Sequence, residues 1–184
     1  MEISVKRTFK LYIIIGFIFV SVVGTLSHFV YEWSGNNRYV SYFVPVNEST
    51  WEHMKLLFFP TVLYMLILVL IHRIRCARDS KLYLEFNKTY PCFFYSINLG
   101  LIKGLVFIPV SFYAYSGILG FNVTWIDMAI FFISVLIVFF TVYKNAYKKS
   151  RKFSLIYLFS LILPAVCFFY FTWNAPKLAL FISP

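Results

Sequence analysis

Charged residues are scarce in this sequence: they make up 13% of its 184 residues, whereas hydrophobic residues make up 61%. A chain of this length with so few charges cannot bury its apolar side chains in a water-soluble core. The scarcity therefore excludes an ordinary soluble domain and predicts a protein of the lipid bilayer. An aromatic content of 22% agrees, because a surface that faces lipid tolerates exposed rings.

Cysteine is also scarce, and its placement excludes two further classes. The three cysteines, Cys76, Cys92 and Cys167, lack the spacing of a cysteine metal motif, and they fall within or on the predicted cytoplasmic side of apolar segments. We therefore expect no disulfide framework. The apolar runs also lack the strict alternation of barrel strands, which excludes a transmembrane β-barrel.

What the sequence does contain is a series of long apolar runs. Five of them are long enough to cross about 30 Å of hydrocarbon as helices, because backbone amides in lipid must bond within their own segment. The sequence therefore predicts an all-α fold, an integral membrane helical bundle in which one domain covers residues 1–184. The predicted spans are 11–31, 54–71, 93–116, 123–143 and 153–173.

Basic residues predict the orientation of this bundle. Most of the 17 Lys and Arg residues fall before the first span, after the second or after the fourth. By the positive-inside rule, the N-terminus is cytoplasmic and the C-terminus extracytoplasmic in a multipass protein of the cell membrane. The net charge of +10 then reflects topology and attraction to the lipid bilayer, so no nucleic-acid partner is needed. The basic residues on the opposite side are Arg38, Lys55 and Lys177.

Histidine and glutamate gather at the predicted extracytoplasmic side. His28 and Glu32 are four residues apart, so they project from the same face of the first span's last turn. Glu48 and Glu52 repeat this spacing at the start of the second span, and His53 follows directly. Because consecutive membrane helices with a short connection are usually neighbours, we expect the two groups to lie close together.

Helix capping explains part of this segment. Ser49 followed by Glu52 has the spacing of a capping box, and Asn47 after a proline is a good cap or turn residue. Capping gives no role to Glu48 or His53. Asn47 and Glu52 are therefore candidates both for capping and for ligand binding.

Imidazole and carboxylate groups are ligands that suit zinc, manganese or iron. His28, Glu32, Glu48 and His53 are therefore candidate ligands of a divalent metal cofactor such as zinc. No H-E-x-x-H motif is present, so a site without metal stays open, in which Glu48 and His53 are the candidate catalytic acid and base. The hydroxyl groups available as nucleophiles belong to Ser27, Ser49 and Thr50.

The third span contains a second unusual feature. Ser96, Gly100 and Gly104 recur at intervals of four, which lets another helix approach closely. Lys103 lies near the middle of the same span, where an unpaired charge is costly. We expect Lys103 to pair with Asp127 or with backbone carbonyls, or to be deprotonated. The alternative is that Lys103 and Asp127 belong to a ligand site in which Lys103 binds an anionic group.

The segments GTLSHFVYEWSGN and PVNESTWEHMKLLFFP, within residues 24–60, resemble a family of small bacterial multipass membrane proteins of unknown function. In that family a His with a Glu one turn later closes the first span, and a P-V-N-E-S-x-W-E-H segment opens the second. The tail departs from the family pattern, with Ala175 in place of a proline and Ser183 in place of an aspartate. The matching positions are His28, Glu32, Pro45, Val46, Asn47, Glu48, Ser49, Trp51, Glu52 and His53.

Three functions remain open from the sequence. The first is a membrane-embedded hydrolase built on the cluster, because imidazole and carboxylate converge near one membrane face. The second is a small-solute transporter or the substrate-binding subunit of one; five spans are few for a transporter, so this requires a homo-oligomer or a partner membrane subunit. The third is a non-catalytic interaction or immunity factor.

Overall fold

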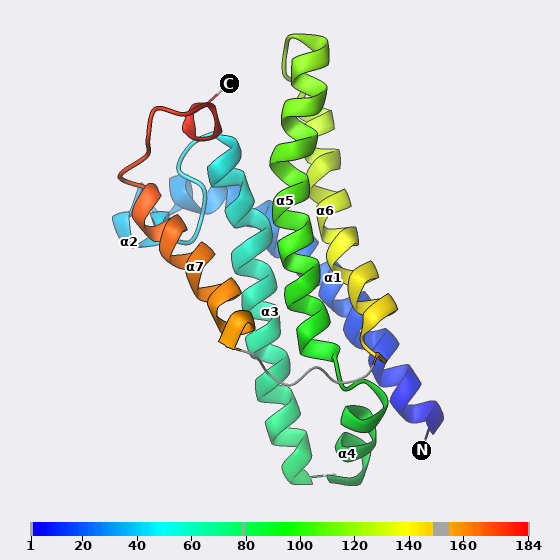
Figure 1. Ribbon diagram of the computed structural model, residues 1–184. Helices are drawn as coiled ribbons and strands as arrows, with labels where there is room; N and C mark the ends of the chain where they lie inside the picture. The colour runs from blue at the N-terminus through cyan, green and yellow to red at the C-terminus, as the bar shows by residue number, and fades with distance from the viewer. Residues whose placement is uncertain (1, 79, 149–154, 184) are drawn as a thin grey trace.

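A computed structural model describes residues 2–78, 80–148 and 155–183, and every regular element in these ranges is helical (Figure 1). The predicted all-α bundle is therefore confirmed. Lys149, Arg151, Lys152 and the start of the span predicted at 153–173 lie outside the described residues. The elements are α1 Glu2–Trp33, α2 Arg38–Ser41, α3 Thr50–Arg78, α4 Ser80–Thr89, α5 Phe93–Leu119, α6 Thr124–Asn145, α7 Leu155–Phe171 and the short 3-10 helix η1 Ala179–Phe181.

Within the described ranges, four helices, α1, α3, α5 and α6, are long and apolar enough to cross a membrane. α7 corresponds to the fifth predicted span but has 17 described residues, or about 26 Å at 1.5 Å per residue. It ends two residues earlier than predicted, because the chain turns at Thr172 and Trp173. α7 still packs against α3, where Phe168 contacts the ring of Phe58 at 5.3 Å between centroids.

The short helices α2, α4 and η1 were not predicted from the sequence, and α4 is the longest of them. α4 is short and mostly polar, so it lacks the long apolar run that marks a span. It buries Tyr83 and Phe86, and the Tyr83 hydroxyl is 3.1 Å from the Tyr12 hydroxyl of α1. α4 therefore closes one end of the bundle through an amphipathic face.

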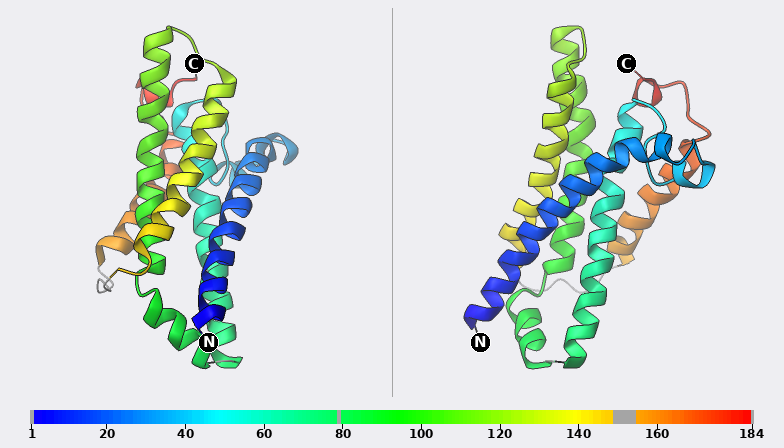
Figure 2. Two further views of the ribbon diagram at one scale, coloured as in Figure 1. Left: turned by 90° about the vertical axis from the view of Figure 1, so that its right-hand side faces the viewer. Right: turned by 180° about the vertical axis from the view of Figure 1, so that it is seen from behind.

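The two ends of the bundle are formed by different segments of the chain. The start of α1, the end of α3, α4 and the start of α5 lie together at one end, which is the end predicted to be cytoplasmic (Figure 1). The last turn of α1 and the first turn of α3 lie toward the opposite end (Figure 2). This arrangement is compatible with the predicted orientation, which stays a prediction.

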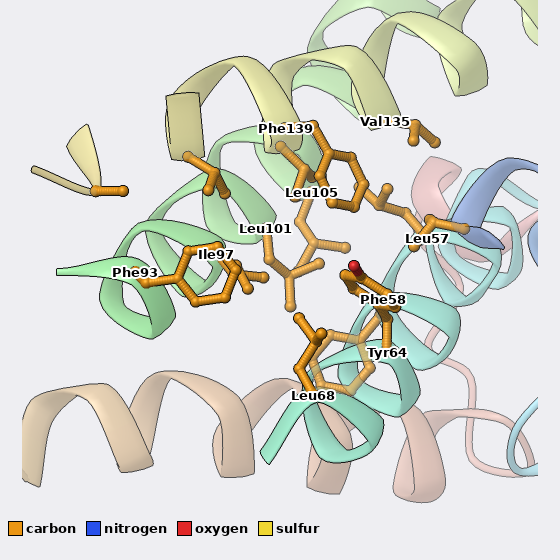
Figure 3. Close-up of a cluster of buried hydrophobic side chains, with 14 of the residues drawn as sticks. Leu57, Phe58, Tyr64, Leu68, Phe93, Ile97, Leu101, Leu105, Val135 and Phe139 are labelled. Carbon is orange, nitrogen blue, oxygen red and sulfur yellow. The ribbon is translucent and has the colours of Figure 1, made fainter. Parts of the chain in front are cut away.

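α3, α5 and α6 share the apolar core shown in Figure 3. Small residues let α5 and α6 approach closely, as predicted: a Cβ on Gly100 would lie 2.6 Å from the Val138 carbonyl oxygen. A Cβ on Gly104 would lie 3.2 Å from the Ser134 carbonyl oxygen. The labelled core side chains are Leu57, Phe58, Tyr64, Leu68, Phe93, Ile97, Leu101, Leu105, Val135 and Phe139.

Candidate metal centre

The end of α1 and the start of α3 bring the predicted histidines together. His28 lies in the last turns of α1, and the chain then reverses through Gly35 and Asn36, whose φ angles are +66° and +60°. These left-handed conformations suit glycine and asparagine. After α2, the loop returns to α3, which places Glu48 just before the helix and His53 in its first turn.

Capping fixes the start of α3 as the sequence predicted. The Ser49 hydroxyl accepts a hydrogen bond from the Glu52 N–H at 3.3 Å, and the Asn47 side-chain oxygen accepts one from the Ser49 N–H at 3.0 Å. The second half of the capping box differs from expectation. The Glu52 carboxylate accepts from the Val46 N–H at 3.1 Å, so it anchors the loop before the helix.

His28, Glu48 and His53 form a compact cluster, which we call the His/Glu triad. One Glu48 carboxylate oxygen lies 3.5 Å from His28 Nε2 and 3.3 Å from His53 Nε2. The two imidazole rings are 5.3 Å apart between centroids. One potential ligand atom from each residue lies within 4.8 Å of the other two, so the triad meets the spatial requirement for a shared metal ion.

The backbone orients one of the imidazoles. His53 Nδ1 is 3.0 Å from the Ser49 carbonyl oxygen, and a carbonyl can only accept, so Nδ1 carries the proton. Nε2 lies toward Glu48, where a protonated nitrogen donates to the carboxylate, and loss of that proton would leave a lone pair for a metal ion. A metal-binding histidine is commonly oriented in this way, through a hydrogen bond from its other nitrogen.

Glu48 is the most exposed member of the triad. Its side chain is 63% exposed, against 33% for His28 and 28% for His53. The hydrogen bond with His53 holds the pKa of Glu48 below its ordinary value, although partial burial opposes this, and the charges of both imidazoles add to the effect. The Glu48 carboxylate is therefore ionised and available as an anionic ligand near neutral pH.

The triad opens into a cavity of about 470 Å³ between α1, α3, α5 and α6. The rest of the wall is largely apolar, with Leu56 from α3, Phe112 from α5 and Phe131 from α6. Asp127 and Asn122 are the main polar additions. The geometry thus combines three metal-ligating groups with an apolar chamber of the size that holds a small molecule.

Glu32, the fourth predicted metal ligand, does not join the triad. It is exposed and lines a separate pocket of about 130 Å³, together with Asn47. His28 and Glu48 line this pocket as well, so the triad lies where the small pocket meets the larger cavity. Asn47 has its capping bond to Ser49 in addition to this position.

Glu52 is buried in an ion pair away from the triad. Its carboxylate is 2.7 Å from Lys55 Nζ, and these side chains are 3% and 0% exposed. Lys55 also donates to the Ser41 carbonyl at 3.0 Å and to the Thr172 hydroxyl at 2.6 Å, which joins α3 to the end of α2 and to the turn after α7. From the sequence, Lys55 was predicted only to be a basic residue of the extracytoplasmic side, although its spacing of three from Glu52 indicates this pair.

Asp127 and Lys103 occupy different surroundings. Asp127 lines the cavity and accepts a hydrogen bond from the Tyr115 hydroxyl. Lys103 is exposed on α5 and, among the described residues, forms no salt bridge. The predicted contact between Lys103 and Asp127 is therefore not formed, because Tyr115 supplies the partner of Asp127 instead.

Comparison with known proteins gives a family but no function. A search of curated proteins and a search of solved structures each found no match. A family model described as "Family of unknown function (DUF6512)" matches residues 1–183. The chain therefore belongs to the DUF6512 family, whose function is unknown.

Proposed function

We propose that this protein is a membrane-embedded zinc-dependent hydrolase, with His28, Glu48 and His53 as the metal ligands. The observation that carries the proposal is the meeting of these three ligand atoms within 4.8 Å at the wall of a cavity. Two imidazoles and one carboxylate are also a donor set of known catalytic zinc sites.

Two of the three distances within the triad suit ligands of one zinc ion, and the two histidine ligand atoms lie within 4.8 Å of each other. Two ligands about 2.0–2.1 Å from zinc at a tetrahedral angle are about 3.3 Å apart. The two distances from Glu48 to the imidazoles, 3.3 and 3.5 Å, are close to this value. Three protein ligands would leave a position for water on a bound zinc ion, and the cavity offers space for a substrate beside the triad.

A zinc ion held by His28, Glu48 and His53 would supply the acidity that activates water for hydrolysis of an ester. In this reaction, water loses a proton as its oxygen bonds to the carbonyl carbon. The bond from that carbon to the alcohol oxygen then breaks, the alcohol oxygen takes up the proton, and the products are a carboxylic acid and an alcohol. Asp127 lines the cavity without belonging to the triad, so it is the carboxylate suited to carry the proton. The hydrogen bond from Tyr115 orients Asp127 for this role.

Hydrolysis of 4-nitrophenyl butanoate by the purified full chain, followed by release of nitrophenolate, tests the proposal. We expect 1,10-phenanthroline to abolish the activity and added zinc to restore it, whereas the non-chelating 1,7 isomer leaves it intact. Because partners of metal ligands alone contribute about 10–100-fold, Glu48→Gln should lower kcat/KM by more than about 100-fold. Glu85→Gln on α4 is the matched control, and activity indifferent to the chelator contradicts the proposal.

A further inference from the structure

We propose that the substrate is an amphiphile with one apolar chain, which enters from the bilayer between α1 and α6 and presents its polar head to the triad. This inference rests on the proposed function and adds the class of substrate. It is argued from the walls of the cavity, from the helices that form its opening and from the position of the triad between two pockets.

The cavity walls suit a hydrocarbon chain. Beyond the triad and Asp127, side chains such as Leu56, Ile108 and Phe131 form most of the lining. An aqueous solute would lose its hydrogen bonds to water in this chamber, whereas an apolar chain would not. A volume of about 470 Å³ lies in the lower half of the range of about 300–1,000 Å³ for small-molecule sites, which favours one chain over two.

The opening of the cavity faces sideways. Three lining residues are also exposed on the outside of the bundle: Phe29 of α1 at 45%, and Met128 and Phe132 of α6 at 42% and 36%. Both helices are candidate membrane spans. The opening therefore lies on a surface suited to lipid rather than on a water-facing tip.

The crossing of α1 and α6 creates this opening. A Cβ on Gly24 would lie 2.6 Å from the Phe131 ring and 2.6 Å from the Leu56 carbonyl oxygen, so the helices touch about one turn before His28. From there α1 and α6 diverge toward the end that carries the triad (Figure 2, right). Phe131, which lines the cavity, thus lies where the two helices touch.

The triad separates an apolar from a polar space. Glu32 and Asn47 line the pocket of about 130 Å³. This pocket and the large cavity have His28 and Glu48 as shared lining residues. A ligand with its chain in the large cavity places its head beside the triad and next to this polar pocket. Water and metal ions can approach the triad through the polar pocket while the chain occupies the apolar one.

A photoactivatable monoacylglycerol with a diazirine near its chain end tests the inference. The zinc-loaded full chain in phosphatidylcholine nanodiscs is irradiated, and the labelled residues are mapped by mass spectrometry. We expect labelling of Leu56 and Phe131 that excess unlabelled monoacylglycerol competes away. Met128→Trp should abolish this labelling by narrowing the opening, whereas Ile133→Trp, an exposed position of α6 outside the lining, should not.

A second pair of variants, on α1, keeps the test valid if Met128→Trp fails to fold. Thr25 lines the cavity, so the ring of Thr25→Phe should fill part of it and reduce the labelling. Val22→Phe is the control, because Val22 is exposed on the same helix and does not line the cavity. Labelling that stays on outward-facing residues, or that neither cavity variant changes, overturns the inference. Zinc measured in the same samples separates the two proposals: bound zinc without labelling of the cavity refutes only the substrate class, and labelling of the cavity without bound zinc refutes the zinc-dependent hydrolase.

Discussion

The buried ion pair between Glu52 and Lys55 yields a quantitative prediction about folding. Replacing Lys55 by methionine keeps an unbranched chain of similar length but removes the ammonium group. Glu52 then keeps its bond from the Val46 N–H at 3.1 Å and loses its partner at 2.7 Å. The Ser41 carbonyl and the Thr172 hydroxyl lose a donor as well.

The expected loss of stability follows from this burial. Removing one partner of a buried pair typically costs about 3–5 kcal/mol, because the other charge stays buried without compensation. Since Glu52 retains the Val46 N–H, we expect Lys55→Met to lower the free energy of unfolding by about 3 kcal/mol. The double variant with Glu52→Gln removes both charges, so it should recover a large part of this loss.

Titration of the detergent-solubilised protein with SDS, followed by far-UV circular dichroism, measures these free energies. Lys177→Met is the matched control, because Lys177 is exposed on the same predicted side. It should change stability by less than about 0.5 kcal/mol. A Lys55→Met protein within about 1 kcal/mol of wild type, or a double variant as unstable as the sum of both single variants, would refute the reasoning.

Three further predictions concern packing, lipid exposure and pH. Gly100→Ala should destabilise the fold by about 1–3 kcal/mol by overpacking against α6, as measured by the same SDS titration. Gly117→Ala is the control and should not destabilise the fold, because its Cβ would meet no atom within 4 Å. Lys103→Leu should leave stability unchanged or raise it, because Lys103 is exposed on an apolar span without a salt bridge in the described chain; a clear loss would reveal a partner. The pKa of Glu48 is lowered from 4.5, so its ionised form stabilises the metal-free fold above that pH, and this contribution is lost as pH falls through the lowered pKa. The difference in stability between wild type and Glu48→Gln should therefore shrink as the pH falls, and a difference that does not change with pH contradicts the assignment.

The sequence predicted the bundle well where the apolar runs were long. Residues 93–116 and 123–143 differ by only a few positions from α5 and α6, since a bilayer requires about 20 apolar residues in a helix. α4 was missed because its amphipathic pattern covers only 10 residues. The small-residue face around Gly100 was predicted correctly, because only a close helix contact explains that spacing.

The candidate site was predicted only in part. His28, Glu48 and His53 stood out because polar groups are rare in such a chain, and the structure brings them together. Glu32 shares a helix face with His28 but lies in the adjacent pocket. The cavity could not be predicted, because it depends on where α1 crosses α6 and on side chains from four helices.

The zinc content of the purified protein tests the central claim most directly. Elemental analysis compares wild type with His28→Ala and His53→Ala, and His72→Ala serves as control because His72 contacts Asn87 at the opposite end of α3. We predict about one zinc ion per chain in wild type and in His72→Ala, and far less in the other two variants. Equal and negligible metal in all four proteins would contradict the account.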